Sequence, residues 1–490
     1  MTAKEFPRLT AGQEEELQSE LQQWSLANGL VMYPPGFVEY SVNVAPVTLF
    51  PTPIPKAAFQ DAVQVQQLFN KLYAKVVSTN KLWLMKILED LSEFDQDFTG
   101  KLLDAHKRAV EESGGKLRQP LSLGLFRSDY MVNEVRGEEA ISQIEFNTVS
   151  VSFGGLSTKA SKLHNHLNQI GAYDSNYSYQ YYDSSEIPIS NSAAALADGL
   201  ADGDCYYNDK NSKCNTIILF IVQDGERNCF DQRLVEFELL KNHGIRSRRL
   251  TLAEVVPNTT INDGKLYIKS TMDEISVVYY RAGYAPYEYE VDSAWNARLY
   301  VEKTAAIKCP TLLTQLSGCK KIQQLLTEEN NIQKFLPDLD SSEMSKITST
   351  FVPIYPLDDT ERGKAARRLA FDCPEKFVLK PQREGGGNNI YKEDIPSFLK
   401  ELPEREWGAY ILMEMIDPPK HKNKIIRNET IYNEPIVSEL GIFGTTLYNE
   451  DTGEILTNKN AGWLLRSKVD SSNEGGVAAG FGCIDSIYLY

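Results

Sequence analysis

Histidine and cysteine, the usual ligands of zinc, are sparse and scattered in this chain of 490 residues. It has five histidines and seven cysteines, and the sequence contains no CxxC pair and no Cys/His cluster. Because a zinc site needs such a cluster, zinc is not expected. The scattered cysteines, odd in number, are typical of reduced thiols in a cytosolic protein.

Long apolar runs are also missing. The longest clear run, residues 217–222, is far shorter than the roughly 20 residues that span a bilayer. Residues 1–7 lack the apolar core of a secretory signal peptide. We therefore expect a cytoplasmic protein without a membrane partner.

Basic residues are fewer than acidic residues. The chain has 51 Lys and Arg against 67 Asp and Glu, a net charge of −16, and a pI near 5.0. Nucleic-acid binders need a basic face that releases counterions, so nucleic acid is not expected as a partner. Small anions can still bind where cations gather locally. With 42% hydrophobic residues, the chain can form a large core and two or three domains.

A glycine-rich loop follows the apolar run at residues 377–379, which predicts a buried strand. Lys380 ends this strand, and the loop contains Glu384 and the glycines 385–387. Glycines let backbone N–H groups approach an anion, a lysine attracts phosphate, and a carboxylate can hold a metal that bridges phosphates. This combination favours a nucleotide phosphate site over the alternative, a surface turn. No Gly-Lys-Ser/Thr follows the glycines, so the loop is not a Walker A loop.

Two predicted strands bring polar groups to their ends. Residues 121–130 form a strand-like run that delivers Arg127. In the next run, Glu145 and Asn147 alternate with apolar residues, so on a strand both face the same way. Carboxylate and amide oxygens suit Mg²⁺, although an ordinary half-exposed strand remains the alternative. Ser150 and Ser152 follow and could bind a small polar ligand.

Apolar spacing predicts further helices and strands in the first 320 residues. The apolar spacing predicts helices over 13–28, with Gly29 as the cap, over 59–91 and over 93–112. Residues 203–213 are typical of a loop at a domain boundary. Beyond it, strands at 216–223 and 275–280, a helix at 230–240 and a hairpin at 262–264 indicate an α/β unit; its second strand delivers Arg281. A helix should then begin at Lys320 and Lys321. Positive charges at a helix start interact unfavourably with the helix dipole, and a bound anion would offset this; a solvated lysine pair is the alternative.

Three further strands are predicted near the carboxyl end of the chain. Residues 409–416 form one, whose edge could bind adenine, with Met413 and Ile416 against the ring; a plain core strand is the alternative. In residues 435–443 Glu439 is a lone acid in an apolar setting, so it should have a cation or a ligand as partner. In residues 461–468 Arg466 and Lys468 share one face, which is reasonable if they flank an anion. Residues 474–482 form a second glycine-rich loop.

Together these features predict an ATP-driven condensation. A carboxylate would be phosphorylated to an acyl phosphate, which an amine then attacks, with cations and Mg²⁺ stabilising the developing charge. No Ser/His/Asp constellation is evident in the sequence, and phosphoryl transfer needs only positioning and electrostatics.

Eight motifs carry a resemblance to a known family over essentially the whole chain. The sequence closely resembles the eukaryotic glutathione synthetases of yeast type, which are homodimeric ATP-grasp ligases. The motifs are IEFNTVSVSFGGL (144–156), ERNCFDQ (226–232), YYRAGY (279–284), TQLSGCKKIQQLL (314–326), KPQREGGGNN (380–389), SELGIFG (438–444), LLRSK (464–468) and EGGVAAGFG (474–482).

The resemblance implies a mixed α/β (α+β) ATP-grasp fold with an inserted, circularly permuted substrate-binding domain and a mobile lid. The implied parts are the first body segment (1–215), the substrate domain (216–318), a connecting helical segment (319–351), the lid (352–433) and the last body segment (434–490). It also implies the joining of γ-L-glutamyl-L-cysteine to glycine, with conversion of ATP to ADP and phosphate.

The resemblance further implies the role of each motif residue. The implied ligands of two Mg²⁺ ions are Glu145, Asn147 and Glu384. The implied ATP-binding residues are Glu145, Lys320, Lys380, Gln382, Arg383, Glu384, Gly385, Gly386, Gly387, Asn388, Asn389, Tyr391, Met413, Glu414, Met415, Ile416, Glu439, Lys468 and Glu474. The implied substrate-binding residues are Arg127, Ser150, Val151, Ser152, Phe153, Glu226, Arg227, Asn228, Gln232, Arg281, Ala282, Gly283, Tyr284, Arg466, Val477 and Ala478. The implied catalytic residues are Arg466, Lys320, Lys380 and Glu384.

Two positions depart from the commoner family pattern, because Ala282 and Glu474 stand where Asp is often found. Two other functions also stay open. One is a ligase of the same fold that uses β-alanine or serine in place of glycine, since one methylene is a weak discriminator. The other is a nucleotide-binding protein without catalysis, which the retention of nearly every expected charged residue disfavours.

Overall fold

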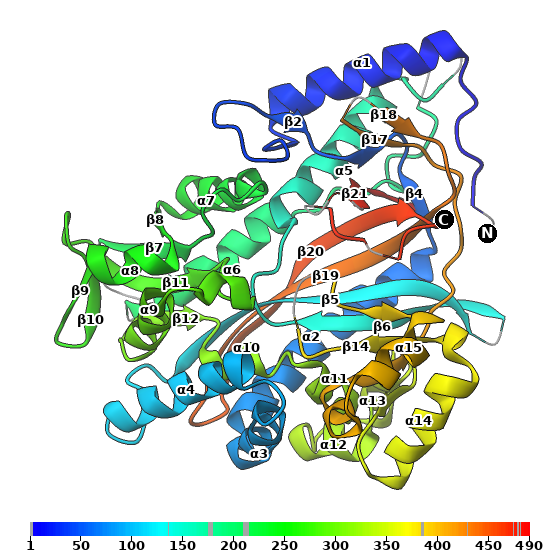
Figure 1. Ribbon diagram of the computed structural model, residues 1–490. Coiled ribbons are helices and arrows are strands. Elements are labelled where there is room, and N and C mark those ends of the chain that lie inside the picture. The colour runs from blue at the N-terminus through cyan, green and yellow to red at the C-terminus, as the bar shows by residue number, and fades with distance from the viewer. Residues whose placement is uncertain are drawn as a thin grey trace.

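The computed structural model describes residues 3–135, 137–174, 180–208, 215–383, 387–428, 430–473, 475–477, 480 and 482–490 (Figure 1). These residues form one large sheet with helices on both faces, a separate four-stranded sheet and two small strand pairs. The expected mixed α/β class is thus confirmed. Among the described residues, no helix is both long and apolar enough to cross a membrane.

The large sheet contains fourteen strands, and its longest members run side by side through the middle of Figure 1. β6 pairs with β5, and β7 pairs with β11 and β8, beside the main path. The main path is, in order, β18 (Thr430–Tyr432), β17 (Ile425–Arg427), β3 (Val47–Thr48), β21 (Gly482–Asp485), β20 (Ile455–Val469), β19 (Ile436–Asn449), β5 (Leu121–Val135), β12 (Ile307–Cys309), β11 (Glu274–Tyr280), β10 (Lys265–Ile268) and β9 (Thr259–Asn262). The three other strands are β6 (Glu138–Asn147), β7 (Thr216–Ile221) and β8 (Arg246–Leu250).

Each face of the central strands packs on its own core, because successive side chains of a strand point to opposite faces. Phe126 belongs to the core shared with α2 (Lys56–Ser78). Its neighbour Leu125 belongs to the core shared with α5 (Gly154–Gln169) and α6 (Ser192–Tyr207). The odd-numbered residues of β5, such as Leu125, lie on this second face, where the polar residues of the predicted site also occur.

The helix expected over residues 59–91 is two helices. α2 ends at Ser78, and α3 (Lys81–Ser92) begins after Asn80, whose side chain accepts the N–H of Trp83 at 3.2 Å. The apolar period continues through the break because both helices bury a face in the same core. The capping preference of Asn80 is the local signal that marks the break.

Two other boundaries also differ from expectation. The range 93–112 contains a π-helix, η1 (Gln96–Gly100), before α4 (Lys101–Glu112). The side chain of Asp95 caps η1 by accepting the N–H of Thr99. The loop expected from residue 203 begins later, because α6 continues to Tyr207; residues 209–214 lie outside the described residues. Gly203 is buried against Val277 and Leu123, so this glycine permits close packing.

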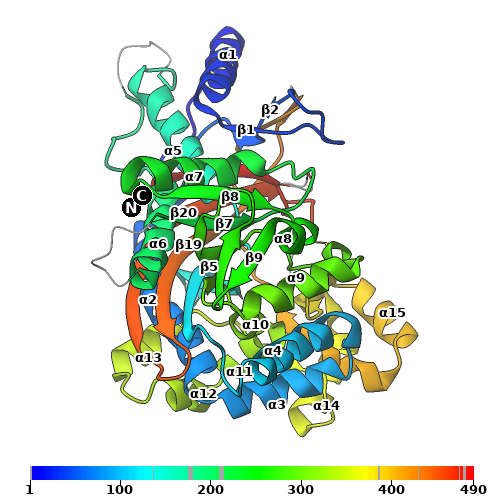
Figure 2. The same cartoon turned by 90° about the vertical axis from the view of Figure 1, so that its left-hand side faces the viewer.

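Residues 216–318 contain the predicted α/β elements (Figure 2). β7, β8, β11 and β12 are parallel neighbours. The predicted hairpin is confirmed in β9–β10, which turns at Asp263 and Gly264, both at positive φ. The helices of this region are α7 (Cys229–His243), α8 (Leu252–Asn258), α9 (Asp292–Glu302) and α10 (Leu312–Leu316), with the short η2 (Pro286–Tyr289).

The separate sheet is entirely antiparallel and follows the order β13–β16–β14–β15. One face packs on the helices α14 and α15 through Phe377 and Leu379. The other face carries a small apolar cluster that includes Val378 and Met413. The elements are β13 (Ile354–Pro356), α14 (Glu361–Asp372), η3 (Pro374–Lys376), β14 (Phe377–Lys380), β15 (Ile390–Tyr391), α15 (Asp394–Glu401), η4 (Glu404–Ala409) and β16 (Ile411–Glu414).

The remaining elements lie outside these two sheets. The expected first helix and its glycine cap are confirmed in α1, where Gly29 is left-handed. The six described cysteines form no disulfide with one another. These elements are α1 (Ala11–Asn28), β1 (Val31–Met32), β2 (Asn43–Val44), β4 (Thr52–Ile54), α11 (Lys320–Leu326), α12 (Glu329–Phe335), α13 (Ser341–Thr348) and β22 (Ile487–Leu489).

Gly462 of β20 should be costly to replace, because it combines a positive φ with close packing against backbone. It has φ 86°, and an added Cβ would lie 2.8 Å from the backbone nitrogen of Ser192. We expect Gly462→Ala to lower the free energy of unfolding by about 2–4 kcal/mol, from strain plus overpacking. Gly29→Ala is the matched control, since Gly29 has φ 77° and open space around it; it should cost only about 1–2 kcal/mol. Equal costs in denaturant melts would contradict the packing argument.

Candidate active site

The centre of the candidate site is the buried carboxylate of Asp129 on β5. Arg127 donates to it through Nε and Nη2 at 2.5 and 2.7 Å. Asn147 of β6 donates from Nδ2 at 2.9 Å, and Arg466 of β20 from Nη2 at 3.2 Å. The Asp129 side chain is fully buried. One carboxylate thus holds together a residue predicted to bind substrate, one predicted to bind metal and one predicted to be catalytic.

The strand register explains this convergence. Arg127 lies opposite Asn147, and Asp129 lies opposite both Glu145 on β6 and Gly441 on β19. Residues directly opposite one another in antiparallel strands share a face. Gly441 leaves the space that the ion pair fills, because an added Cβ would lie 2.9 Å from Arg127 Cδ and from Asp129 Oδ1.

Glu439 has the cationic partner that its apolar setting required. It lies opposite Arg466 in the β19–β20 ladder, and Arg466 Nη2 donates to its Oε1. Burial raises the pKa of Glu439, against the opposing effect of the Arg466 charge. Burial also acts to lower the pKa of Arg466, but Glu439 and Asp129 raise it overall. Arg466 is therefore paired with protein carboxylates in this structure, and an anionic ligand is not required to explain its place.

Two lysines approach Glu145 from other elements. Lys320, the first residue of α11 as predicted, donates to Glu145 Oε2 at 3.0 Å. Lys380, at the end of β14, donates to the carbonyl oxygen of Ile144 at 3.1 Å. Although burial acts to raise the pKa of Glu145, the charges of Lys320 and Lys380 hold it well below its usual range. Burial lowers the pKa of Lys380 to about 8, despite the opposing charge of Glu145.

The serine-containing loop before α5 wraps around a second arginine, Arg281. Arg281 donates from Nη1 to the carbonyl oxygen of Val151 at 2.6 Å and from Nη2 to Ser152 Oγ at 2.8 Å. Arg127 Nη1 reaches the carbonyl oxygen of Ser152 at 3.3 Å, and Ser150 Oγ donates to the carbonyl oxygen of Tyr280. Ser150 and Phe153 have positive φ. The two arginines therefore meet at this loop.

Asp231 of α7 holds the same loop from the other side. Its Oδ2 accepts the N–H of Phe153 at 2.8 Å, and its Oδ1 accepts the N–H groups of Gly155 and Leu156 at 2.7 and 3.0 Å. Its carboxylate also lies 3.7 Å from Arg281 Nη1. These bonds satisfy N–H groups that would otherwise be unpaired at the start of α5.

The predicted residues around 226–232 form a polar group next to Asp231. Gln232 donates to Glu226 and accepts from Arg249 at 2.7 Å. Burial raises the pKa of Glu226. Arg227 Nε donates to the carbonyl oxygen of Tyr33 at 3.1 Å, and Asn228 is buried.

The loop after β11 is held by Glu288 of η2. Its carboxylate accepts the N–H groups of Gly283, Tyr284 and Ala285 at 2.8–2.9 Å. Ala282, one of the two departures from the family pattern, is buried in the apolar core.

Part of the predicted ATP set lies in and around the connection between β14 and β15 of the four-stranded sheet. Gln382 Oε1 accepts the N–H of Lys321 at 3.0 Å, which ties β14 to α11. Arg383 donates two hydrogen bonds to the carboxylate of Asp95, at 2.5 and 2.9 Å, so its charge is paired within the protein. Asn389 Nδ2 donates to the hydroxyl of Tyr391 at 3.2 Å. Glu384, Gly385 and Gly386 lie outside the described residues; Gly387 and Asn388 are described and follow them.

The residues predicted to contact adenine gather on one face of that sheet. Met413 is buried there, and Tyr391, Met415 and Ile416 are partly buried around it. Glu414 accepts a hydrogen bond from the hydroxyl of Tyr355 at 3.1 Å.

The last predicted residues surround a small hollow beside Arg466. Its lining includes Val437, Glu439, Lys468 and Gly475. Lys468 donates to the carbonyl oxygens of Ser472 and Asn473 at 2.6 and 2.8 Å. Val477, two residues after Gly475, is buried. Glu474 and Ala478 lie outside the described residues.

The sequence analysis did not single out Asp129, Asp231 and Glu288, which hydrogen-bond to residues and loops of the predicted site. The signal for Asp129 was its position two residues after Arg127, which puts both on one face of a strand. Asp231 lies inside the motif at 226–232, but its partners are far away in the sequence. Within the described residues, no group of three or more acidic, histidine or cysteine side chains is arranged to hold a metal by itself.

Asp129→Asn should destabilise the protein strongly, because it removes the charge that faces two arginines. Breaking a buried ion pair typically costs about 3–5 kcal/mol. Glu89→Gln is the control: Glu89 pairs with Lys107 at 2.6 Å, but both side chains are about half exposed, so the cost should stay below about 1 kcal/mol. Similar melting temperatures for Asp129→Asn and Glu89→Gln would show that Asp129 is not the centre of the site.

Comparisons with known proteins show the family to which the chain belongs. A family model described as "Eukaryotic glutathione synthase, ATP binding domain" matches residues 11–489. The glutathione synthetase large chain of Schizosaccharomyces pombe is 42% identical over 512 residues, covering 99% of both chains. Human glutathione synthetase is 38% identical over 481 residues, which cover 97% of this chain and 96% of the human one.

A solved structure extends the similarity to the fold. It is a glutathione synthetase-like effector from Globodera pallida in its apo form, with a TM-score of 0.76 over 100% of both chains. At 22% identity this match concerns the fold alone. Since the family model and the close relatives cover nearly the whole sequence, the chain belongs to the eukaryotic glutathione synthetase family of ATP-dependent, ATP-grasp ligases.

Proposed function

We propose that this protein joins γ-L-glutamyl-L-cysteine to glycine with ATP, giving glutathione, ADP and phosphate. The observation that carries this proposal is the gathering of Arg127, Arg281 and Arg466 with Glu145 and two lysines around one face of the sheet. A reaction between a carboxylate and ATP needs such a cationic site. The family relatives named glutathione synthetase supply the identity of the substrates.

The dipeptide would bind between β5, the loop before α5 and the loop after β11. Arg127 and Arg281 provide the charges for its carboxylates, and Ser150 to Phe153 provide hydroxyls and backbone groups. Glu226 and Gln232 would bind its amino end, since Glu226 is a half-buried acid whose pKa is raised by burial and which would be stabilised by an ammonium group. Asp231 and Glu288 would act as positioning residues for the two loops.

Magnesium fits the chemistry of the donor set. Glu145 offers a carboxylate, and Asn147 turns its amide nitrogen toward Asp129, so its amide oxygen is directed away from that carboxylate. Oxygen donors of this kind suit Mg²⁺. We propose that Glu145, Asn147 and Glu384 hold two ions. When bound, these ions would neutralise charge on the phosphates of ATP.

ATP would bind between the central sheet and the four-stranded sheet. Lys320 and Lys380 would contact its phosphates, together with the backbone of the glycine-rich loop. The apolar face around Met413 and Tyr391 offers a surface for adenine. Glu439 and Lys468, with Glu474 outside the described residues, complete the proposed ATP set.

The proposed chemistry has two steps. The dipeptide carboxylate attacks the γ-phosphorus of ATP, ADP leaves, and an acyl phosphate forms. The amine of glycine then attacks the acyl carbon; the C–N bond forms, the C–O bond to phosphate breaks, and the amine loses a proton. Arg466 would stabilise negative charge on the acyl phosphate and the tetrahedral intermediate.

We propose the division into residues 1–215, 216–318, 319–351, 352–433 and 434–490, with 216–318 as a circularly permuted substrate domain. Residues 352–433 would form the lid, and its moving part would be the four-stranded sheet with its own apolar clusters. β17 and β18, at the end of that range, pair with the central sheet. Closure would exclude water from the acyl phosphate. We also expect the homodimer of the family.

The experiment that tests the function measures ADP release with ATP, Mg²⁺ and γ-glutamylcysteine, with glycine, β-alanine, serine or no amine. We expect release that depends on γ-glutamylcysteine and is fastest with glycine. Faster release with β-alanine or serine would keep the chemistry and change the acceptor. No release with any amine, despite ATP binding, would overturn the proposal in favour of a binding protein.

Arg466→Ala should lower kcat by at least about 100-fold while changing ATP affinity less than about threefold, as expected for a group that stabilises developing charge. Because the change also leaves Glu439 and Asp129 without this cation, Arg466→Lys serves as the charge-conserving control. Rapid-quench turnover and equilibrium binding of an ATP analogue separate the two effects. Equal losses of affinity and turnover would contradict the catalytic role.

The low pKa of Lys380 predicts a pH dependence of ATP use. Since its pKa is about 8, the ammonium loses its proton as the pH rises through 8, and the attraction for phosphate is lost. We expect kcat/KM for ATP, with the other substrates saturating, to be halved near pH 8 and to fall by about tenfold per pH unit above it. Lys380→Arg stays charged and should show no such decline. A flat profile for the unmodified protein would contradict this role of Lys380.

A further inference from the structure

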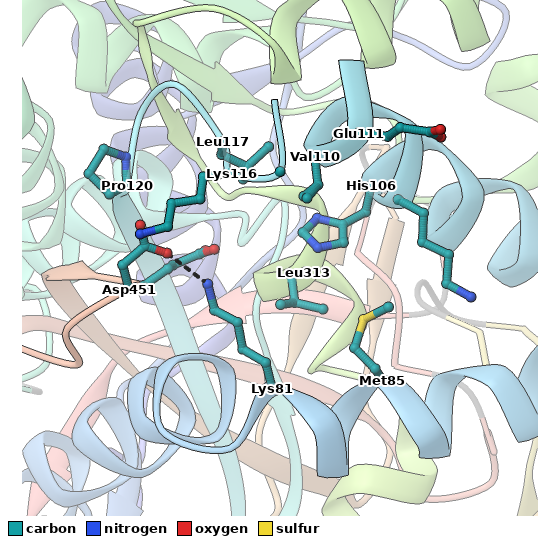
Figure 3. Close-up of a pocket in the computed structure, with 13 residues that line it drawn as sticks. Lys81, Met85, His106, Val110, Glu111, Lys116, Leu117, Pro120, Leu313 and Asp451 are labelled. Carbon is teal, nitrogen blue, oxygen red and sulfur yellow. Dashed lines mark hydrogen bonds and ion pairs between the residues drawn. The ribbon is translucent and has the colours of Figure 1, made fainter. Parts of the chain in front are cut away.

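One buried glutamine, Gln315, lies between several parts of the candidate active site. It is a residue of the short helix α10 and belongs to the motif at 314–326, in which only Lys320 has an implied role. Leu313, in the same helix, lines a cavity of about 330 Å³ between α3 and α4 (Figure 3). Gln315 is not among the described residues of that lining, and its side chain contacts the loop after β11 instead.

The amide of Gln315 has a fixed orientation. Its Nε2 donates to the carbonyl oxygen of Gly283 at 2.8 Å, and its Oε1 accepts from Nη2 of Arg298 at 3.1 Å. A rotated amide would turn its NH₂ group toward a guanidinium, which offers no acceptor. Arg298 is itself fully buried, with its guanidinium 3.7 Å from the centre of the Tyr280 ring. Gln315 therefore links a buried arginine to the backbone of Gly283.

The peptide group between Gly283 and Tyr284 is held from both sides. Its carbonyl oxygen also accepts from the hydroxyl of Tyr289 at 3.1 Å, and its N–H donates to Glu288 Oε2 at 2.9 Å. Gly283 has φ 89°, and a residue without a Cβ turns more freely than any other. The hydrogen bonds, including the one from Gln315, therefore decide the direction of this peptide group and of Tyr284 after it.

The backbone of Gln315 contacts a second part of the site. Its carbonyl oxygen accepts from Thr148 Oγ1 at 3.0 Å, and Thr148 directly follows the predicted magnesium ligand Asn147. Gly318 leaves room for this contact, because an added Cβ would lie 2.4 Å from Thr148 Oγ1. Gln315 is thus connected to the predicted dipeptide loop by its side chain and to the predicted magnesium segment by its backbone.

We propose that Gln315 is a positioning residue for the dipeptide substrate. Its amide holds the peptide group of Gly283 in the direction in which the loop presents Arg281 and Tyr284 to γ-glutamylcysteine. This role rests on the proposed function, which supplies the ligand of the loop. A substitution changes the side chain and keeps the backbone contact with Thr148, so binding of the dipeptide should be affected and binding of ATP should not.

Gln315→Glu separates the two bonds of the amide. A carboxylate can still accept from Arg298 but cannot donate to Gly283, so the contact with the loop is lost. We expect KM and the equilibrium dissociation constant for γ-glutamylcysteine to rise about tenfold, while KM for ATP changes less than about threefold. Equal increases in both KM values, or an unchanged dissociation constant for γ-glutamylcysteine, would overturn the proposal.

Gln119→Glu is the matched control. Gln119 also donates from Nε2 to a backbone carbonyl oxygen, that of Ala305 at 2.6 Å, and it accepts from the N–H of Leu121. These three residues are not in the predicted site, so both KM values should equal those of the unmodified protein. Gln315→Met, uncharged and of similar length, is a second variant in case Gln315→Glu does not fold, and it should separate the two KM values in the same way. Circular dichroism checks the folding of each variant.

Hydrogen–deuterium exchange tests the loop without any substrate. The N–H groups of Gly283 and Tyr284 are bonded to Glu288, and a loop that loses Gln315 should open more often. We expect residues 281–285 to exchange at least about fivefold faster in Gln315→Glu and at an unchanged rate in Gln119→Glu. Unchanged exchange in Gln315→Glu would overturn the proposal. Faster exchange, in a protein that releases no ADP with γ-glutamylcysteine and any amine, would support the Gln315 contact and overturn the proposed function.

Discussion

The carboxylate of Asp129 is the interaction on which the candidate site depends. It is fully buried and accepts hydrogen bonds from Arg127, Asn147 and Arg466, which come from three different strands. A buried charge of this kind is stable only when paired, and each arginine is equally dependent on its partner. The three strands must therefore keep their register for the charges to match. Gly441 contributes by leaving the space that the ion pair occupies.

The same principle explains how an acidic protein can present a cationic site. The net charge is −16, yet arginines and lysines outnumber acids where the strands β5, β6, β19 and β20 meet. Each cation lies against a carboxylate or a carbonyl oxygen: Lys320 against Glu145, Lys380 against Ile144. This pairing keeps the cations in place and buried, and burial in turn makes their charge effective on a phosphate because water does not screen it.

Much of the site could be predicted from local patterns, because strands and their ends leave clear signals. The alternation around Glu145 placed it beside Asn147, and the lone acid Glu439 required a cation, which proved to be Arg466. Other features had no local signal. Asn80 divides a continuous apolar period into two helices, and only its cap bond shows why. Residues 384–386 carry the most distinctive motif and lie outside the described residues.

The sequence by itself determined the class of the protein, its predicted chemistry and the residues that face one another along a single strand, because periodicity and composition are local properties. The tertiary structure decided which strands became neighbours. Asp129 lies 337 positions from Arg466 in the chain, and only the antiparallel register of β5, β19 and β20 makes them partners. The same holds for Gln315, which meets Thr148 from 167 positions away and Gly283 from 32 positions away. Contacts of this kind arise from packing, which no short stretch of sequence specifies.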